Sequence, residues 1–152
     1  MIEIRAACTT DLDQLLVLLP QLSSRATSPG AQVASTEEAK QIFAQMHADN
    51  RLKLLVAVET NTQRLLGSIL LVVVPNLTYS GRPWAIIENV VVARSERRRG
   101  VGRQMIEEAV KLARAEGCYK VQLISGTKPE QLAFYKELGF QTEQSVGHKL
   151  YL

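Results

Sequence analysis

The residues of this sequence that most clearly suggest chemistry are arginines and glycines in one stretch, ARSERRRGVGR, at positions 93–103. Five of the eleven arginines lie between positions 94 and 103, where a strand-like apolar run passes into a helical pattern. Gly100 and Gly102 at such a junction let the backbone approach a ligand closely, and the first amides of a helix have no partner within it. Together with the helix dipole and the arginine side chains, this arrangement predicts an anion site suited to phosphates.

Two common phosphate-binding glycine loops do not match this stretch. A P-loop requires the run G-x-x-x-x-G-K-[ST], which the sequence does not contain. A dinucleotide-binding fingerprint requires a small residue three positions after the second glycine, where Met105 stands. An ordinary helix start beside a solvated run of charges remains the alternative interpretation of the glycines and arginines.

The elements that would position this site alternate between strands and helices. Hydrophobic periodicity predicts strands at residues 2–6, 53–59, 65–74, 85–93, 119–124 and 140–151. It predicts helices from Thr9 and Thr10, which can cap, to Pro20, from the capping box Ser35-x-x-Glu38 onward, and at residues 101–116 and 129–138. The resulting order, β-α-α-β-β-β-α-β-α-β, is that of an α/β protein with a mixed sheet and helices on its faces. Apolar faces are expected on the second helix from Ile42, Phe43 and Met46, and on the third from Val101, Met105, Ala109 and Leu112.

The size and composition of the chain limit what the protein can be. Its 152 residues, 46% of them hydrophobic and 22% charged, fit one soluble globular domain covering residues 1–152. The absence of an apolar leader and of any run long enough to span a bilayer predicts a cytoplasmic protein with no membrane partner. We expect Cys8 and Cys118 to be small buried residues rather than a disulfide or metal pair, so no metal site is predicted. His47 and His148 are expected at the surface.

Two motifs together resemble the GCN5-related N-acetyltransferase (GNAT) family. The first is a strand ending at Val92, a short turn, and Arg97-Arg98-Arg99-Gly100-Val101-Gly102, which is similar to the family's [RQ]-x-x-G-x-[GA] helix start. The second, Leu132-Ala-Phe-Tyr135-Lys-Glu-Leu-Gly139-Phe140, resembles its A-x-x-F-Y-x-x-x-G-F helix and turn. The chain departs from common family patterns at Arg94, where proline is frequent, and at Glu96, where an aromatic residue is frequent. The asparagine that often follows the fifth strand is replaced here by the region 125–127.

The resemblance implies an N-acetyltransferase domain that uses acetyl-CoA. It implies that the pantetheine arm is held by the end of the fourth strand, and the pyrophosphate by the turn that follows. The residues implied for the pantetheine arm are Val90, Val91 and Val92. Those implied for the pyrophosphate are Arg97, Arg98, Arg99, Gly100, Val101, Gly102 and Arg103.

Glu88 is the candidate general base. Acetyl transfer needs a neutral amine, whereas a lysine-like amine has a pKa of about 10.4 in water, so a base acting directly or through water is useful. Glu88 stands in an otherwise apolar strand, where a carboxylate is costly without a partner or a raised pKa. Its counterpart in some relatives serves as base or holds a water molecule. An ion-paired or edge-exposed glutamate is the alternative.

Tyr135 is the candidate general acid, because it occupies the family's acid position. It would protonate the leaving thiolate, whose pKa lies near that of a free thiol, about 8.5. The alternative is a core tyrosine, since Leu132, Tyr135 and Leu138 form a helical stripe. Acceptor walls are expected at loops 23–35 and 75–84. In the second loop, Tyr79 and Trp84 offer stacking, and Arg82 would suit an amine that carries a carboxylate or phosphate.

Three functions compete on the sequence alone. The first is an N-acetyltransferase acting on a primary amine of a small molecule or peptide, and the second is a non-catalytic acyl-CoA-binding sensor on the same fold. The third, a nucleic-acid binder, is the weakest, since outside positions 94–103 the chain carries 13 Lys and Arg against 14 Asp and Glu. No nucleic-acid partner is therefore expected, and the resemblance leaves a homodimer open.

Overall fold

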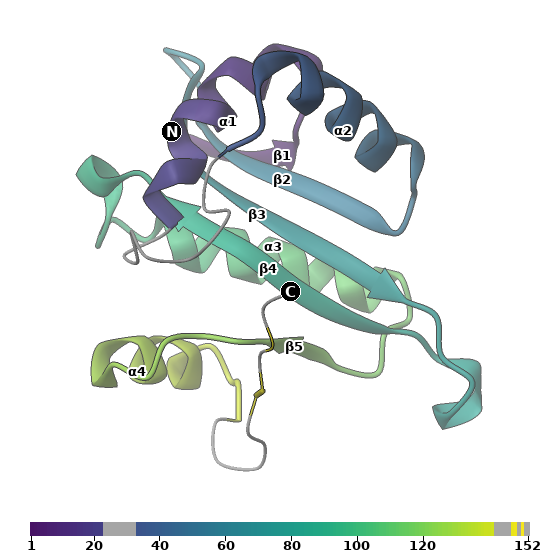
Figure 1. Ribbon diagram of the computed structural model, residues 1–152. Coiled ribbons are helices and arrows are strands. Elements are labelled where there is room, and N and C mark those ends of the chain that lie inside the picture. Colours follow the sequence, from purple (N-terminus) through teal and green to yellow (C-terminus); the bar gives the residue numbers. More distant parts are fainter. Residues whose placement is uncertain (23–32, 142–146, 149, 151–152) are drawn as a thin grey trace. The chain divides into compact units, whose positions relative to one another are not determined.

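The computed structural model describes residues 1–22, 33–141, 147–148 and 150 (Figure 1). The chain divides into two compact units, Met1–Gln122 and Leu123–Leu152, and each is described by itself. The strands are β1 (Ile2–Ala6), β2 (Leu52–Glu59), β3 (Arg64–Val74), β4 (Trp84–Val92) and β5 (Val121–Leu123). The α-helices are α1 (Leu12–Leu18), α2 (Thr36–Ala48), α3 (Val101–Ala115) and α4 (Pro129–Glu137). Short 3₁₀ helices are η1 (Thr9–Asp11), η2 (Leu19–Leu22), η3 (Tyr79–Gly81) and η4 (Arg94–Glu96).

The strands form one mixed sheet in the order β1-β2-β3-β4-β5, which confirms the predicted fold class. The first four strands are antiparallel neighbours, as expected for strands joined by short connections. The pairing of β3 with β4 contains a bulge: Ser68 faces Val91, whereas Leu70 faces Glu88. The extra residue on β4 changes the direction of its side chains just before the strand ends.

One face of the sheet is covered by α1 and α2. The core on this side is built from Leu15 of α1, Phe43 of α2, and Val56 and Val58 of β2, all of them buried. The capping box that begins α2 forms as predicted, since the Ser35 hydroxyl accepts a hydrogen bond from the amide of Glu38, and the Glu38 carboxylate accepts one from the amide of Ser35. The expectation for Ile42 is wrong, because its side chain points away from the core and is exposed.

The start of α1 is held by a carboxylate rather than by a threonine hydroxyl. Thr9 and Thr10 lie in η1, and the Asp11 carboxylate accepts a hydrogen bond from the amide of Cys8. The same carboxylate accepts two hydrogen bonds from the Arg5 guanidinium, at 2.6 and 2.8 Å. The Arg5 hydrogen bond lowers the pKa of Asp11 to about 2, so the carboxylate is charged at neutral pH although it is buried. The predicted threonine cap is therefore replaced by an ion pair between β1 and η1.

The opposite face of the sheet is covered by α3, which passes behind β3 and β4 in Figure 1. Its buried side chains follow the helical period and include most of the predicted stripe, with Val101, Met105, Ile106, Ala109 and Ala113 inside. A Cβ atom built on Gly67 of β3 would lie 2.8 Å from the terminal carbon of Met105, so helix and strand approach closely there.

The second unit contains the end of β5 and the helix α4. Gly139, with φ of 87°, ends α4, and the amide of Phe140 then bonds back to the carbonyl of Tyr135. This reversal is why the predicted strand over residues 140–151 does not begin at Phe140. The described residues of that stretch lie in no strand, and the others, 142–146, 149 and 151, are outside the described residues.

Candidate active site

The end of β4 is shaped by the bulge at Asn89. Asn89 has a φ of 52°, in the left-handed region where asparagine is one of the few tolerated residues. Glu88 and Asn89 are exposed, Val91 is buried, and Val90 and Val92 are half-buried. Val90, Val91 and Val92, for which pantetheine contacts are expected, therefore lie directly between the bulge and the turn that enters α3.

The turn at residues 97–103 has the backbone of an anion site. Gly100 is the N-cap of α3 and has a φ of 79°, a conformation that a side chain would strain. The first hydrogen bond between turns of the helix runs from the amide of Gln104 to the carbonyl of Gly100, at 3.1 Å. The amides of Val101, Gly102 and Arg103 precede that bond, as the first amides of any helix do, and the positive end of the helix dipole lies among them.

The arginines of the turn are used in different ways. The Arg97 guanidinium donates to the carbonyl of Val92 at 3.3 Å, which closes the turn onto the end of β4. Arg99 pairs with Glu96 at 2.6 Å. Arg103 faces Glu107 at 4.0 Å, one turn along α3. Arg98 has a φ of 62°, and its side chain makes no hydrogen bond or ion pair with any residue that the structure describes.

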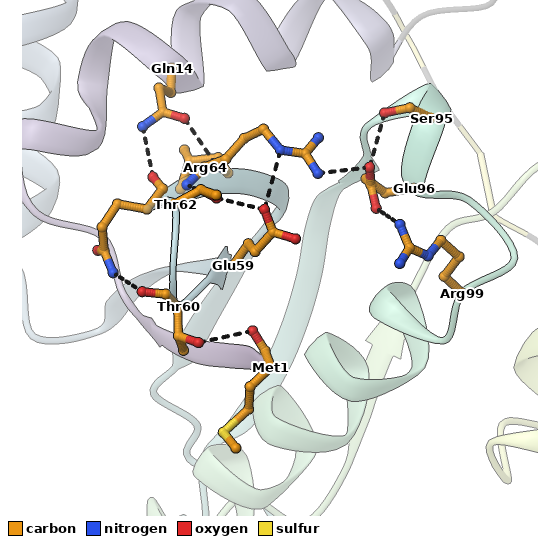
Figure 2. Close-up of polar contacts among 11 residues, drawn as sticks. Met1, Gln14, Glu59, Thr60, Thr62, Arg64, Ser95, Glu96 and Arg99 are labelled. Carbon is orange, nitrogen blue, oxygen red and sulfur yellow. Dashed lines mark hydrogen bonds and ion pairs between the residues drawn. The ribbon is translucent and has the colours of Figure 1, made fainter.

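A buried carboxylate, Glu96, lies directly before the turn, and the sequence alone did not indicate its burial. Only 5% of Glu96 is exposed, although it stands in a run of charged residues. Figure 2 shows its carboxylate between two arginines, with Arg64 at 3.0 Å and Arg99 at 2.6 Å, and with the Ser95 hydroxyl at 3.2 Å. The hydrogen bond from Arg64 lowers the pKa of Glu96, and the charge of Arg99 acts in the same direction. Only the departure from the family's aromatic residue at this position marked it as unusual.

Glu88, the candidate base, is not in an apolar environment. Its side chain is exposed, and within the described residues its carboxylate has no ion pair. The expectation of a costly buried carboxylate is wrong, because Glu88 lies on the face of the sheet that it shares with Leu70 and Ile86, which are themselves only half-buried. An exposed carboxylate next to the proposed pantetheine residues can accept a proton directly or hold a water molecule.

Tyr135, the candidate acid, belongs to the second unit. Its ring is half-buried between Phe134 and Phe140, with ring centroids 5.0 and 5.8 Å away in edge-on contacts. Burial raises the pKa of Tyr135, so the phenol keeps its proton over a wider pH range. In the same stripe Leu132 is exposed and Leu138 is half-buried, so Tyr135 is not in a fully apolar core.

The residues expected to bind the acceptor are largely occupied by contacts inside the first unit. Arg82 donates to the carbonyls of Gly117 and Cys118, both at 3.3 Å, and Tyr79 stacks on Tyr119 with ring centroids 4.0 Å apart. Lys120 lies over the Trp84 ring at 5.0 Å. The other expected wall, the loop at 23–35, lies mostly outside the described residues, since only residues 33–35 are described.

A shallow hollow of about 470 Å³ lies beside the turn instead. It is lined by Pro20 and Gln21 of η2 and by Ala93, Arg94 and Ser95, which follow β4. The Gln21 side chain accepts a hydrogen bond from the amide of Arg94 at 2.9 Å, so η2 and the strand end are held together there. Its volume is within the range of small-molecule sites.

The cysteines and histidines take no part in the candidate site. Cys118 is buried as expected, and burial raises the pKa of its thiol. The same expectation for Cys8 is wrong, because Cys8 lies at the exposed start of η1, where its thiol contacts the Asp11 carboxylate. His47 and His148 are exposed, as predicted.

These features fit the binding of acetyl-CoA. Gly100 holds a left-handed conformation at the helix start, and three amides precede the first bond of α3. Gly67 keeps β3 close to Val91, since a Cβ atom there would lie 2.7 Å from the Val91 carbonyl oxygen. A diphosphate would be bound by the amides and arginines of the turn.

Comparison with known proteins identifies relatives over most of the chain. Residues 19–140 match the Acetyltransferase (GNAT) family. A glucosamine 6-phosphate N-acetyltransferase of Trypanosoma brucei brucei is 33% identical over 143 residues, which cover 94% of this chain and 91% of that protein. The crystal structure of a Trypanosoma brucei acetyltransferase covers 100% of both chains with a TM-score of 0.85 and 33% identity. An N-alpha-acetyltransferase 80 of Mus musculus is 43% identical over 61 residues, 40% of this chain and 18% of that protein.

None of the helices in the described part of the chain is long and apolar enough to cross a bilayer. The matching family and the relatives, which are named as acetyltransferases, favour an enzyme over a non-catalytic sensor. The chain therefore belongs to the GNAT family and is an acetyltransferase.

Proposed function

We propose that this acetyltransferase moves an acetyl group from acetyl-CoA directly to the primary amine of a small molecule or peptide. The observation that carries the proposal is the start of α3, where Gly100 caps the helix and arginines flank amides that precede its first hydrogen bond. Acetyl-CoA, when bound, supplies an activated thioester acyl group and a thiolate leaving group. No cysteine nucleophile is needed for direct transfer, in keeping with the buried position of Cys118.

The proposed cofactor contacts divide between strand and turn. Val90, Val91 and Val92 would bind the pantetheine arm through their backbone groups. The amides of residues 100–103 and the arginines around them would bind the pyrophosphate. Arg98, whose side chain makes no hydrogen bond or ion pair with any described residue, is the arginine best placed to turn toward a ligand.

Glu88 is proposed to accept the proton that the amine loses. A protonated amine cannot attack, so the proton must move to Glu88, or to water held by Glu88, before or during formation of the new carbon–nitrogen bond. The exposed position of Glu88 next to Val90 and Val91 supports this role, because an acceptor can reach the carboxylate from solvent. Ordinary carboxylate chemistry is sufficient, and no apolar pocket around Glu88 is required.

Tyr135 is proposed to donate a proton to the sulfur as the carbon–sulfur bond breaks. A phenol whose pKa is raised by burial remains protonated at neutral pH and is available as a donor. The phenolate that is left would then regain a proton from solvent or from the proton released by the amine. The proton that Glu88 accepts from the amine therefore balances the proton that Tyr135 donates to the thiolate.

The first acceptor to test is glucosamine 6-phosphate. The relative that covers 94% of this chain is named for that substrate. An amine that carries a phosphate also suits the hollow beside the turn, which is lined by the positively charged Arg94. An N-terminal peptide amine is the second acceptor to test, since a shorter part of the chain is similar to an N-alpha-acetyltransferase.

The test begins with thermal unfolding in the presence and absence of acetyl-CoA. At 100 times its dissociation constant a ligand adds about 2.7 kcal/mol of stability, which raises the midpoint by several degrees. The shift should vanish in an Arg97→Ala/Gly102→Glu variant and persist in Arg114→Ala, which removes a charge at the other end of α3. Release of CoA is then measured with glucosamine 6-phosphate, glucosamine and a peptide as acceptors. No midpoint shift at millimolar acetyl-CoA would overturn the proposal.

A further inference from the structure

Glu96 connects the turn at residues 97–103 to the rest of the first unit. It ends η4, immediately before the turn, and its carboxylate is buried. On one side it pairs with Arg99, inside the turn, at 2.6 Å. On the other side it pairs with Arg64, the first residue of β3, at 3.0 Å (Figure 2). One carboxylate therefore joins two segments that lie 32 positions apart in the sequence.

The Arg64 end of this connection is itself held in place. Arg64 also faces Glu59, across the β2–β3 hairpin, at 3.7 Å. The backbone on both sides of Arg64 is bonded to Gln14 of α1, since the Gln14 side chain accepts from the amide of Leu65 at 2.9 Å and donates to the carbonyl of Gln63 at 3.1 Å. Figure 2 shows this line of contacts from Gln14 through Arg64 and Glu96 to Arg99. The turn is thus tied to the hairpin and, through it, to α1.

The turn needs such a support because its backbone conformation is unfavourable. Arg98 has a φ of 62°, which costs a non-glycine residue about 1 kcal/mol or more. Such a residue persists when its neighbours hold it in place. Both neighbours of Arg98 are anchored, Arg97 on the carbonyl of Val92 and Arg99 on Glu96.

The charges of this network also matter for an anion. A lone carboxylate next to the turn would repel a phosphate group, and burial would strengthen that repulsion. Glu59 and Glu96 are matched by Arg64 and Arg99, so the network as a whole is neutral. The charge of Arg99 is balanced within the network, whereas the charges of Arg97 and Arg98 are not balanced by a carboxylate among the described residues and would attract an anion.

We propose that Glu96 is a positioning residue of the acetyl-CoA site, which holds the turn at residues 97–103 in its binding conformation by joining Arg99 to Arg64. The proposal rests on the proposed function, because it assigns that turn to the pyrophosphate. Glu96 does not touch the ligand, and its effect passes through Arg99 and the backbone of Arg98. Binding of CoA should therefore depend on a carboxylate that lies beside the site rather than in it.

The experiment compares Glu96→Gln with Asp11→Asn. Both variants remove a buried carboxylate that pairs with an arginine in the first unit, and Asp11 lies at the start of α1, away from the turn. We expect both to lower the unfolding midpoint. Glu96→Gln should weaken CoA binding at least tenfold, measured by titration calorimetry, while Asp11→Asn changes it less than twofold. Arg64→Met keeps the pair of Glu96 with Arg99, so this variant should fold even if Glu96→Gln does not. It should weaken CoA binding about threefold.

Hydrogen exchange of the ligand-free proteins separates this proposal from the proposed function. The amides of residues 97–103 should exchange faster in Glu96→Gln than in the parent, and at the parent rate in Asp11→Asn. Equal exchange in Glu96→Gln and parent, or an equal loss of CoA affinity in Glu96→Gln and Asp11→Asn, would overturn the role of Glu96. If the parent does not bind CoA but exchange in the turn still rises in Glu96→Gln, the proposed function fails while the role of Glu96 in holding the turn stands.

Discussion

Gly67 and Val91 approach so closely across the β3–β4 pair that a Cβ atom on Gly67 would lie 2.7 Å from the Val91 carbonyl oxygen. The same Cβ atom would lie 2.8 Å from the terminal carbon of Met105, a flexible side-chain end that can move aside, whereas the Val91 carbonyl belongs to the backbone of β4 and can move only with that strand. This glycine therefore sets how closely the end of β4, with its proposed pantetheine residues, lies to β3. Its small size is needed for packing, and its backbone needs no left-handed conformation.

Gly67→Ala is expected to lower the free energy of unfolding by about 1–3 kcal/mol, the usual cost of overpacking. It should also weaken CoA binding, because the end of β4 must move away from Gly67. The control is Gly81→Ala, where φ is +74° but no atom lies within 4 Å of the new Cβ, so that only local backbone strain is added. Denaturant unfolding and calorimetry of both variants check the prediction, which fails if Gly67→Ala binds CoA as the parent does.

Glu88→Gln is expected to lower kcat roughly 100- to 10,000-fold, the range found for a lost general base. Because Glu88 is exposed, the unfolding midpoint and the dissociation constant for CoA should remain those of the parent. Glu3→Gln provides the matched control, since Glu3 is also an exposed strand glutamate of the first unit. Steady-state kinetics with a responsive acceptor measures the difference. Equal kcat in Glu88→Gln and Glu3→Gln would remove Glu88 from the mechanism.

Tyr135→Phe is expected to lower kcat on the order of 100-fold while CoA still binds. The substitution keeps the ring and its edge-on contacts with Phe134 and Phe140, so α4 and the turn after it should fold normally. The raised pKa of Tyr135 also predicts that the parent keeps full activity past the ordinary phenol pKa of 10 unless another group titrates first. Phe134→Leu, which removes one ring neighbour but no hydroxyl, is the control. A Tyr135→Phe enzyme with parental kcat would rule out the acid role.

Acid should weaken the fold through the ion pair of Asp11 with Arg5. The hydrogen bond from Arg5 lowers the pKa of Asp11 from 3.8 to about 2. Since the folded pKa is the lower one, the pair stabilises the protein fully above pH 3.8 and loses its contribution as the pH falls through about 2. At pH 7, Asp11→Asn should cost about 1–2 kcal/mol, because a partly exposed Arg5 limits the gain.

Urea unfolding of the parent and of Asp11→Asn at several pH values measures this contribution. The gap between the two proteins should narrow as the pH falls from 4 to 2. Asp49→Asn removes a carboxylate whose pKa is also lowered to about 2 by an arginine, but Asp49 pairs with Arg51 only two positions away. Asp49→Asn should therefore lower the free energy of unfolding at neutral pH by less than Asp11→Asn does. A gap that stays constant down to pH 2 would show that Asp11 is not the titrating group.

Features that depend on neighbouring residues were predictable from the sequence. The capping box of Ser35 with Glu38, the helix start at Gly100, and most of the apolar stripe of that helix formed as expected. Each depends on contacts within one or two turns, where residue type and spacing are sufficient. The predicted threonine cap before α1 was wrong because Asp11 binds Arg5, a residue of another element.

The sequence by itself determined the family, the fold class and the strand–turn–helix segment where an anion can bind, because these depend on motif order and local periodicity. Only the tertiary structure decided which charges remain available at that segment. Arg64 and Glu96 lie 32 positions apart, and their pairing buries a carboxylate that the sequence places in a solvated run. The tertiary structure likewise decided that Glu88 is exposed, although its apolar neighbours in the sequence predicted burial. Burial and charge pairing depend on which segments meet in space, and spacing along the chain does not contain that information.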